Sequence, residues 1–342
     1  MNKPYIFFWL DDQRNKVEDM RGVVETGIPE RDLSATVHFR EMTIDAIKGI
    51  EDLAGDIRTA NADMIIVDHI FNQTGPLNTK GSSIAHLLRT AFPHIPIVCV
   101  SAAWAASAPK TSFDHEDLSE YTNIFPYLQL ADELDLLFAI AKDFKRCADF
   151  VSSDVHGKFS SFLLDAPAME VESLEKIIPQ EFNSTDLKTT PHRVARWILR
   201  SFIAHPGYLY NDLRVATLLG LNLDGFNKIR DKFDASLYRG VFATETQPRW
   251  WVAGVHELLA QLAPRDAPNA TQLAGRMIDG VTEADYSKCW VSESVLPPPD
   301  SVAYPDNNSR EEVAVQSIHT RLYPANASGI PGFESRLVLM KR

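Results

Sequence analysis

The chain has 342 residues, which is enough for two or three domains that each bury a core of their own. Its 34 basic and 46 acidic side chains give a net charge of −12, which argues against a protein that coats nucleic acid with its whole surface. Three distant cysteines, Cys99, Cys147 and Cys289, form no CxxC pair, so we expect a reducing, cytoplasmic location without a disulfide framework or a zinc site. No apolar run approaches the roughly 20 residues of a membrane span, so no membrane partner is expected.

Residues 1–148 alternate short apolar runs with amphipathic stretches. The apolar runs predict strands in IFFWL (6–10), ATVHFRE (35–41), ADMIIVD (62–68) and PIVCVSA (96–102), with a weaker strand near NIFPYLQL (123–130). Helical spacing of apolar residues predicts helices near 14–26, 44–57, 82–92 and 131–144. The alternation therefore predicts an α/β domain with a doubly wound, parallel, five-stranded sheet.

Polar side chains end several of the predicted strands. Asp11 and Asp12 follow the first strand, Asp68 ends the third and Ser101 lies at the end of the fourth. Because the carboxyl ends of parallel strands line one edge of a sheet, we expect these side chains to lie together. Three carboxylates at one edge repel each other unless a cation is present, so Asp11, Asp12 and Asp68 predict an Mg²⁺ site. A DD pair alone is more often a turn or a helix N-cap, so the prediction depends on all the strand ends together.

The stretches WLDDQ, MIIVDHIF and LLRTAFPHIPIVCVSA resemble a response-regulator receiver domain, over residues 1 to about 145. The resemblance implies a flavodoxin-like fold, Mg²⁺ held by the acidic pair, and phosphorylation of Asp68. It also implies that the Ser101 hydroxyl hydrogen-bonds the phosphoryl group. A sensor kinase or another protein is the partner that this family implies, and autophosphorylation is the most that could be called an enzyme activity.

One position departs from the receiver pattern. Receivers carry a lysine at the end of the fifth strand, usually just before a proline, and Gln129 stands at about that position here. A neutral amide cannot replace the ion pair that such a lysine makes with phosphoryl oxygens. Lys80, in the long loop before Gly81, is an alternative source of the positive charge. A phosphate-switched regulator and a phosphate-independent pseudo-receiver scaffold therefore both remain open.

Residues 149–188 predict a connector, and residues 189–265 predict a helical, winged-helix-like domain. Its outline is two short helices around Gly220, an N-cap in LNLD (221–224), and the hairpin-like stretch LYRGVFATETQPRWW (237–251). Residues 186–250 hold ten basic and six acidic side chains, which leaves a DNA-binding transcriptional regulator as a further alternative. The candidate nucleic-acid contacts on the second helix are Lys228, Arg230 and Lys232, and two aspartates on the same helix weaken that signal.

Residues 266–342 predict a small β-containing region, from the runs CWVSESV, SVAYP, EEVAVQSIHTRLYP and SRLVLMKR. Cys289 with His256 or His319 carries no catalytic signature, so no enzyme is expected there. The whole sequence thus predicts a response-regulator-like signalling protein in which a receiver-like domain controls a C-terminal interaction module. We expect it to serve a bacterial defence or stress system, with a homodimer left open.

Overall fold

The computed structural model describes residues 3–43, 50–71, 80–102, 104, 115–153, 158–183, 189–204, 207–262 and 283–286, with four strands beyond residue 300. The chain forms two compact units. Unit 1 comprises Met1–Leu163 with Ile178–Leu199, and unit 2 comprises Leu164–Ile177 with Arg200–Arg342. The division of the sequence into 1–148, 149–188, 189–265 and 266–342 stays a prediction, and the contacts distribute the expected connector between both units.

Unit 1 is built on a five-stranded sheet in which every neighbouring pair is parallel. Its strands are β1 (Tyr5–Asp11), β2 (Ala35–Glu41), β3 (Met64–Val67), β4 (Ile97–Ser101) and β5 (Asn123–Pro126), in the order β2-β1-β3-β4-β5. Every residue of β3 and of β4 is buried, as expected of central strands covered on both faces. The predicted parallel five-stranded sheet is therefore confirmed.

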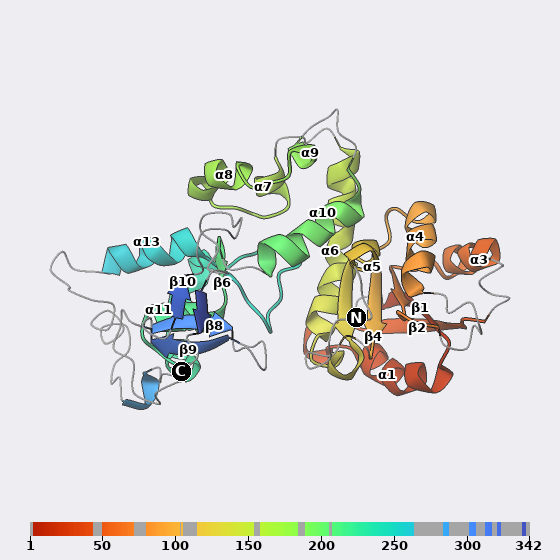
Figure 1. Cartoon of the computed structure of the whole chain (residues 1–342), viewed down its shortest axis with the longest axis horizontal. Coiled ribbons are helices and arrows are strands. Elements are labelled where there is room, and N and C mark those ends of the chain that lie inside the picture. The colour runs from red at the N-terminus through yellow and green to blue at the C-terminus, as the bar shows by residue number, and fades with distance from the viewer. Residues whose placement is uncertain are drawn as a thin grey trace. The chain divides into compact units, whose positions relative to one another are not determined.

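Helices cover both faces of this sheet (Figure 1). They are α1 (Arg14–Thr26), α3 (Ile50–Ala60), α4 (Gly81–Ala91), α5 (His115–Glu120) and α6 (Leu134–Ser152). Leu53 of α3 and Leu88 of α4 share one core cluster with Leu10 of β1. Phe138 of α6 packs against Phe7 of β1, with ring centroids 5.5 Å apart. Because Phe7 and Leu10 stand an odd number of residues apart on one strand, they face opposite sides, and the sheet is doubly wound as predicted.

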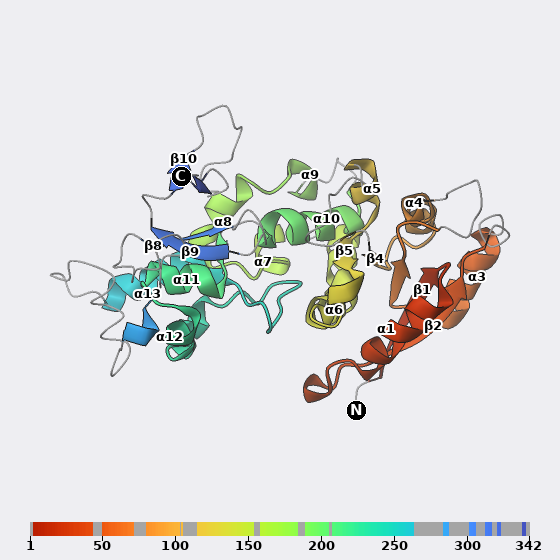
Figure 2. The ribbon, with the colours of Figure 1, turned by 60° about the horizontal axis from the view of Figure 1, so that its bottom comes forward.

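Three short helices of unit 1 follow α6 in the sequence. They are α7 (Phe159–Phe162), α9 (Gln180–Asn183) and α10 (Pro191–Trp197). In two views α10 lies against α6 (Figures 1 and 2), and the ring of His192 is 4.8 Å from that of Phe144 on α6. Phe159 stacks on Phe182 and meets Trp197 edge to face. Unit 1 thus extends the sheet domain with a group of short helices, of which α10 contacts α6.

Unit 2 begins with helical elements and one short strand pair. They are α8 (Ala168–Glu175), β6 (Leu209–Tyr210), α11 (Asp212–Leu218), α12 (Leu223–Asn227), a 3₁₀ helix (Arg230–Ser236), β7 (Trp250–Trp251) and α13 (Val252–Leu262). Gly220, with φ +69°, lies between α11 and α12, and Asn222 caps α12 by accepting a hydrogen bond from the Gly225 amide. The predicted pair of short helices around Gly220 is therefore present, whereas winged-helix character stays a prediction.

The C-terminal region contains short strands. β8 (Ser301–Pro305) pairs with β9 (Glu312–Gln316), and β10 (Thr320–Leu322) pairs with β11 (Leu337–Leu339), both antiparallel. The predicted run CWVSESV, with Cys289, and also His319 lie outside the described residues. Among the helices that the structure describes, none combines the length and the hydropathy that crossing a bilayer requires.

Candidate functional site

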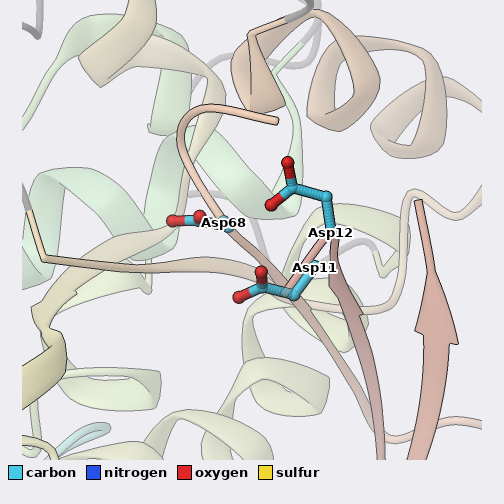
Figure 3. Close-up of side chains that lie close together, drawn as sticks. All are labelled: Asp11, Asp12 and Asp68. Atoms are coloured by element: carbon cyan, nitrogen blue, oxygen red, sulfur yellow. The ribbon is translucent and has the colours of Figure 1, made fainter. Parts of the chain in front are cut away.

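Three aspartates converge at the carboxyl edge of the sheet in unit 1. Asp11 ends β1 and Asp12 follows it, while Asp68 comes directly after β3, the strand paired with β1. One carboxylate oxygen from each aspartate lies within 4.8 Å of the other two. Figure 3 shows the three side chains side by side, two from the end of β1 and one from the segment after β3. The expected convergence is thus present in the structure.

All three carboxylates are buried, with exposed fractions of 0% for Asp11, 1% for Asp12 and 5% for Asp68. A buried charge is costly unless hydrogen bonds or opposite charges compensate it. The backbone amide of Gln13 donates to Asp11 Oδ1 at 2.9 Å, and that of His69 donates to Asp68 Oδ1 at 2.8 Å. Each of these two carboxylates therefore has one oxygen held by the backbone.

Lys16 brings a positive charge into the same site. Its Nζ atom lies 3.2 Å from Asp11 Oδ2 and 3.0 Å from Asp68 Oδ2, and its side chain is 12% exposed. The lysine comes from the first turn of α1, the helix that begins where β1 ends. The sequence prediction missed it because the lysine was sought at the end of the fifth strand. Its position four residues after Asp12, at the start of the next helix, is the signal that could have found it.

The charges in this site are unbalanced. Burial is the largest cause that raises the pKa of Asp11 to about 6; the charge of Asp68 adds to this effect and Lys16 opposes it. Burial also raises the pKa of Asp68, again against the effect of Lys16. Burial by itself would lower the pKa of Lys16, but the carboxylates of Asp68 and Asp11 outweigh it and raise that pKa. One ammonium among three carboxylates leaves an excess of negative charge when all are ionised.

This donor set fits Mg²⁺. The ion takes hard oxygen ligands and is commonly held in proteins by one or two carboxylates, with waters or phosphate completing the shell. The three clustered carboxylates offer such oxygens, and the negative charge that remains beside Lys16 is of the sign that a divalent cation neutralises. Asp11, Asp12 and Asp68 are therefore the residues that would hold it.

Ser101 and Gln129 lie at different places relative to the site. Ser101 ends β4, is 4% exposed and pairs with Pro126 of β5 at the same edge of the sheet. Gln129 lies beyond the end of β5, exposed in the 3₁₀ turn η4 (Tyr127–Gln129). The residue before Pro126 is the fully buried Phe125, so an apolar ring stands where the receiver pattern has its lysine. Gln129 therefore lies in the turn after β5, and its correspondence to the receiver lysine stays a prediction.

Lys80, the alternative cation, is anchored to α5. Its Nζ atom lies 2.7 Å from Asp117 Oδ2, and the hydroxyl of Ser82 donates to the other oxygen of that carboxylate at 2.5 Å. Asp117 is itself buried. This ion pair connects the beginning of α4 with α5.

In unit 2, the basic candidates Lys228 and Arg230 have carboxylate partners. Lys228 pairs with Asp285, and Arg230 Nη2 lies 3.6 Å from Asp212 Oδ2. Lys232 is exposed. The two ion pairs reduce the positive charge that these side chains could offer to phosphates.

The strand order and the helices define the fold of unit 1. A parallel sheet in the order 2-1-3-4-5 with helices on both faces is the flavodoxin-like arrangement of CheY-type receivers, which bind ligands at the carboxyl edge of the strands. Unit 1 therefore has a flavodoxin-like fold, the fold that CheY-type receivers share, extended by the short helices that follow α6. The acidic cluster lies at the ligand-binding edge of that fold.

No protein-family model and no curated protein matches the chain. Among solved structures, a CheY-like receiver domain from Methylobacillus flagellatus is 15% identical, with 36% of this chain and 86% of that chain covered and a TM-score of 0.26. The receiver domain of Francisella response regulator 1452 is 18% identical, with coverage of 40% and 99% and a TM-score of 0.27. The RcsB response regulator of Salmonella typhimurium is 14% identical, with coverage of 42% and 62% and a TM-score of 0.30.

Proposed function

We propose that this chain is a response-regulator-like signalling protein whose unit 1 accepts a phosphoryl group on Asp68 in the presence of Mg²⁺. The observation that carries the proposal is the meeting of three buried carboxylates within 4.8 Å at the carboxyl edge of a receiver-type sheet. Buried like charges cost stability, so their concentration at a ligand-binding edge favours a functional role over a structural one. The partner is a sensor kinase or another protein, and the output is an interaction made by unit 2.

The chemistry would be an in-line attack by the Asp68 carboxylate on the phosphorus atom of a donor. A bond forms between a carboxylate oxygen and phosphorus while the bond between phosphorus and the donor's leaving group breaks. The charge of Lys16 favours the ionised form of Asp68 against the effect of burial, and the hydroxyl of Ser101 would donate to a phosphoryl oxygen from the end of β4. Bound Mg²⁺ would neutralise charge on the transferred group.

The full chain tests this proposal with acetyl phosphate as the donor. We expect intact-mass analysis to show one added phosphoryl group in the presence of Mg²⁺, none in EDTA, and none in Asp68→Asn. Asp149→Asn is the matched control, because Asp149 is an exposed aspartate on α6. Absence of labelling in the wild type together with absence of beryllofluoride binding would show that the proposed function is wrong.

A phosphate-independent scaffold is the second candidate function, and Phe125 is the observation that favours it. The apolar ring at the end of β5 cannot make the ion pair with a phosphoryl group that the receiver lysine makes. This candidate predicts that Asp68→Asn leaves partner binding unchanged, whereas the phosphate-switched reading predicts loss of the response to the donor. Co-purification of partners with the wild type and with Asp68→Asn separates the two.

DNA binding by unit 2 is a weaker alternative, because Lys228 and Arg230 are engaged with Asp285 and Asp212. It predicts a duplex affinity that falls steeply with salt and that is lost when Lys228, Arg230 and Lys232 are neutralised. An unchanged affinity in that triple variant would remove this alternative. Service in a bacterial defence or stress system remains part of the proposal.

A further inference from the structure

We propose that Lys16 on α1 is the positioning residue that binds the phosphoryl group of Asp68, and that Tyr127 connects its state to the turn after β5. This inference rests on the proposed function. In this inference the positive charge that the receiver pattern places on the fifth strand comes from α1. The turn η4 is then the segment whose structure responds to phosphorylation of Asp68.

The first observation is the position of the ammonium group. Lys16 Nζ lies between two carboxylates, 3.2 Å from Asp11 and 3.0 Å from Asp68. Both carboxylates are buried, and the lysine side chain is itself 12% exposed. An ammonium at hydrogen-bond distance from the attacking carboxylate is also within reach of oxygens attached to that carboxylate. Lys16 therefore has the position that a phosphoryl-binding cation needs.

The second observation is that Lys16 opposes the local preferences of its helix. The first turn of α1 contains no acidic residue, and Gln13 at the N-cap makes no side-chain capping hydrogen bond. Cations at a helix N-terminus are disfavoured by the helix dipole. Arg14, the other cation of this turn, points outward with a 62% exposed side chain and pairs with Glu41. Lys16 instead enters the site, and a residue that breaks a local rule in this way is typical of functional positions.

The third observation is the contact of Lys16 with Tyr127. The ammonium lies 5.3 Å from the centroid of the tyrosine ring, and the tyrosine hydroxyl donates to the backbone oxygen of Lys16 at 3.1 Å. Tyr127 is the first residue of η4, directly after the last residue of β5. Lys16 thus contacts the acidic site with its ammonium group and the β5–α6 connection with its backbone.

Phosphorylation changes the charges that Lys16 faces. When an oxygen of Asp68 forms its bond to phosphorus and acetate leaves the donor, the carboxylate loses its negative charge and the phosphoryl oxygens bring new ones. The ammonium of Lys16 is then attracted most strongly to the phosphoryl oxygens, while it keeps its ion pair with Asp11. A shift of the ammonium toward the phosphoryl oxygens changes its distance from the Tyr127 ring. Because Tyr127 is the first residue of η4, the structure of that turn changes when Asp68 is phosphorylated.

The full chain tests the inference in four forms: wild type, Lys16→Gln, Lys16→Arg and Lys142→Gln. Lys142, an exposed lysine on α6, is the control. Titration calorimetry measures Mg²⁺ affinity and then beryllofluoride affinity at saturating Mg²⁺. A charge-assisted contact such as that between Lys16 and Asp68 is worth roughly ten- to a hundredfold in affinity, and the ammonium competes with Mg²⁺ for the same carboxylate oxygens. We therefore expect Lys16→Gln to bind Mg²⁺ at least about tenfold more tightly and beryllofluoride at least about tenfold more weakly.

The opposite signs of the two changes separate positioning from a structural role. If Lys16 only stabilised the fold, both affinities would fall together with the melting temperature, and the inference would be overturned. Lys16→Arg keeps the charge, so it should recover beryllofluoride binding in part. Equal beryllofluoride affinities of the wild type and of Lys16→Gln would overturn the role of Lys16 and leave the proposed function intact. A wild type that binds no beryllofluoride overturns the proposed function, and this inference with it.

The connection between Lys16 and η4 through Tyr127 is tested by hydrogen exchange of peptides that cover residues 123–133. We expect beryllofluoride with Mg²⁺ to change exchange there in the wild type and to have less effect in Tyr127→Leu, which lacks both the hydroxyl and the aromatic ring. Equal changes in the two proteins would show that Tyr127 does not connect Lys16 to η4.

Discussion

His192 Nδ1 on α10 lies 3.2 Å from Oγ1 of Thr122, the residue directly before β5, so a helix remote in sequence contacts the beginning of an edge strand. The imidazole is 2% exposed and packs against Phe144 of α6. Burial is the largest cause that lowers its pKa to about 3, and the positive charges of Arg89 and Arg196 act in the same direction. His192 is therefore neutral in the folded chain at neutral pH.

This buried histidine predicts acid sensitivity of unit 1. In the unfolded chain His192 takes up a proton near pH 6.5, whereas the folded chain resists protonation down to about pH 3. Its contribution to stability is thus complete above pH 6.5 and is lost as the pH falls. Between pH 6.5 and pH 4 the loss amounts to about 3 kcal/mol. Urea unfolding at several pH values should show a smaller acid loss in His192→Gln than in the wild type.

The control for this prediction is His38→Gln, because His38 is exposed on β2. That variant should show the same pH dependence as the wild type. If His192→Gln and the wild type lose stability in parallel between pH 6.5 and pH 4, the neutral buried state of His192 is contradicted.

Removing one carboxylate from the acidic cluster should raise the melting temperature in the absence of metal and reduce the further rise that Mg²⁺ causes. Asp12 raises the pKa of Asp68 by repulsion, so Asp12→Asn should melt at a higher temperature than the wild type in EDTA. Mg²⁺ should raise the melting temperature of the wild type, since a ligand at a hundred times its dissociation constant adds about 2.7 kcal/mol to stability. Scanning calorimetry should show a much smaller Mg²⁺ effect in Asp12→Asn, and an equal effect in both would exclude Asp12 as a ligand.

Gly81 is required by close packing beside the phosphoacceptor candidate. A Cβ atom at Gly81 would lie 1.8 Å from the backbone oxygen of Asp68, which forces that backbone to move. We expect Gly81→Ala to lower the free energy of unfolding by about 2 kcal/mol or more and to weaken acceptance of phosphoryl groups. Gly22→Ala is the matched control, because a Cβ there meets nothing within 4 Å and alanine favours a helix. A Gly81→Ala variant as stable as Gly22→Ala would contradict the tight contact.

The sheet of unit 1 was predictable because burial leaves a clear pattern in single sequences. The run MIIV is buried at every position of β3, and a continuous apolar run of that length is typical of a central parallel strand. Once the strands are placed, the convergence of Asp11, Asp12 and Asp68 follows from the geometry of parallel sheets. These predictions needed only local patterns and one general rule.

The origin of the positive charge was less accessible to sequence reasoning. NIFPYLQL keeps apolar residues beyond Pro126, so the sequence predicts a strand near 123–130, whereas β5 ends at Pro126 and the chain continues as a 3₁₀ turn. The role of Lys16 depends on a contact between α1 and the end of β3, which spacing within α1 does not indicate. The packing of α10 on α6 is hidden for a similar reason, because an amphipathic helix shows which face is buried and not what covers it.

Asn222 should contribute to the stability of unit 2 through the beginning of α12. Its side-chain oxygen accepts a hydrogen bond from the Gly225 amide at 2.7 Å, and its amide nitrogen donates to the backbone oxygen of Ala284. Loss of an N-cap costs about 1 kcal/mol, so calorimetry of Asn222→Ala should show a lower melting temperature. Asn222→Asp keeps the capping oxygen and places a negative charge at the helix N-terminus, so it should retain more stability than Asn222→Ala. Asn227→Ala, at the exposed C-terminal end of α12, is the control that should change little. If Asn222→Ala and Asn227→Ala have the same melting temperature, the Asn222 cap does not stabilise this helix pair.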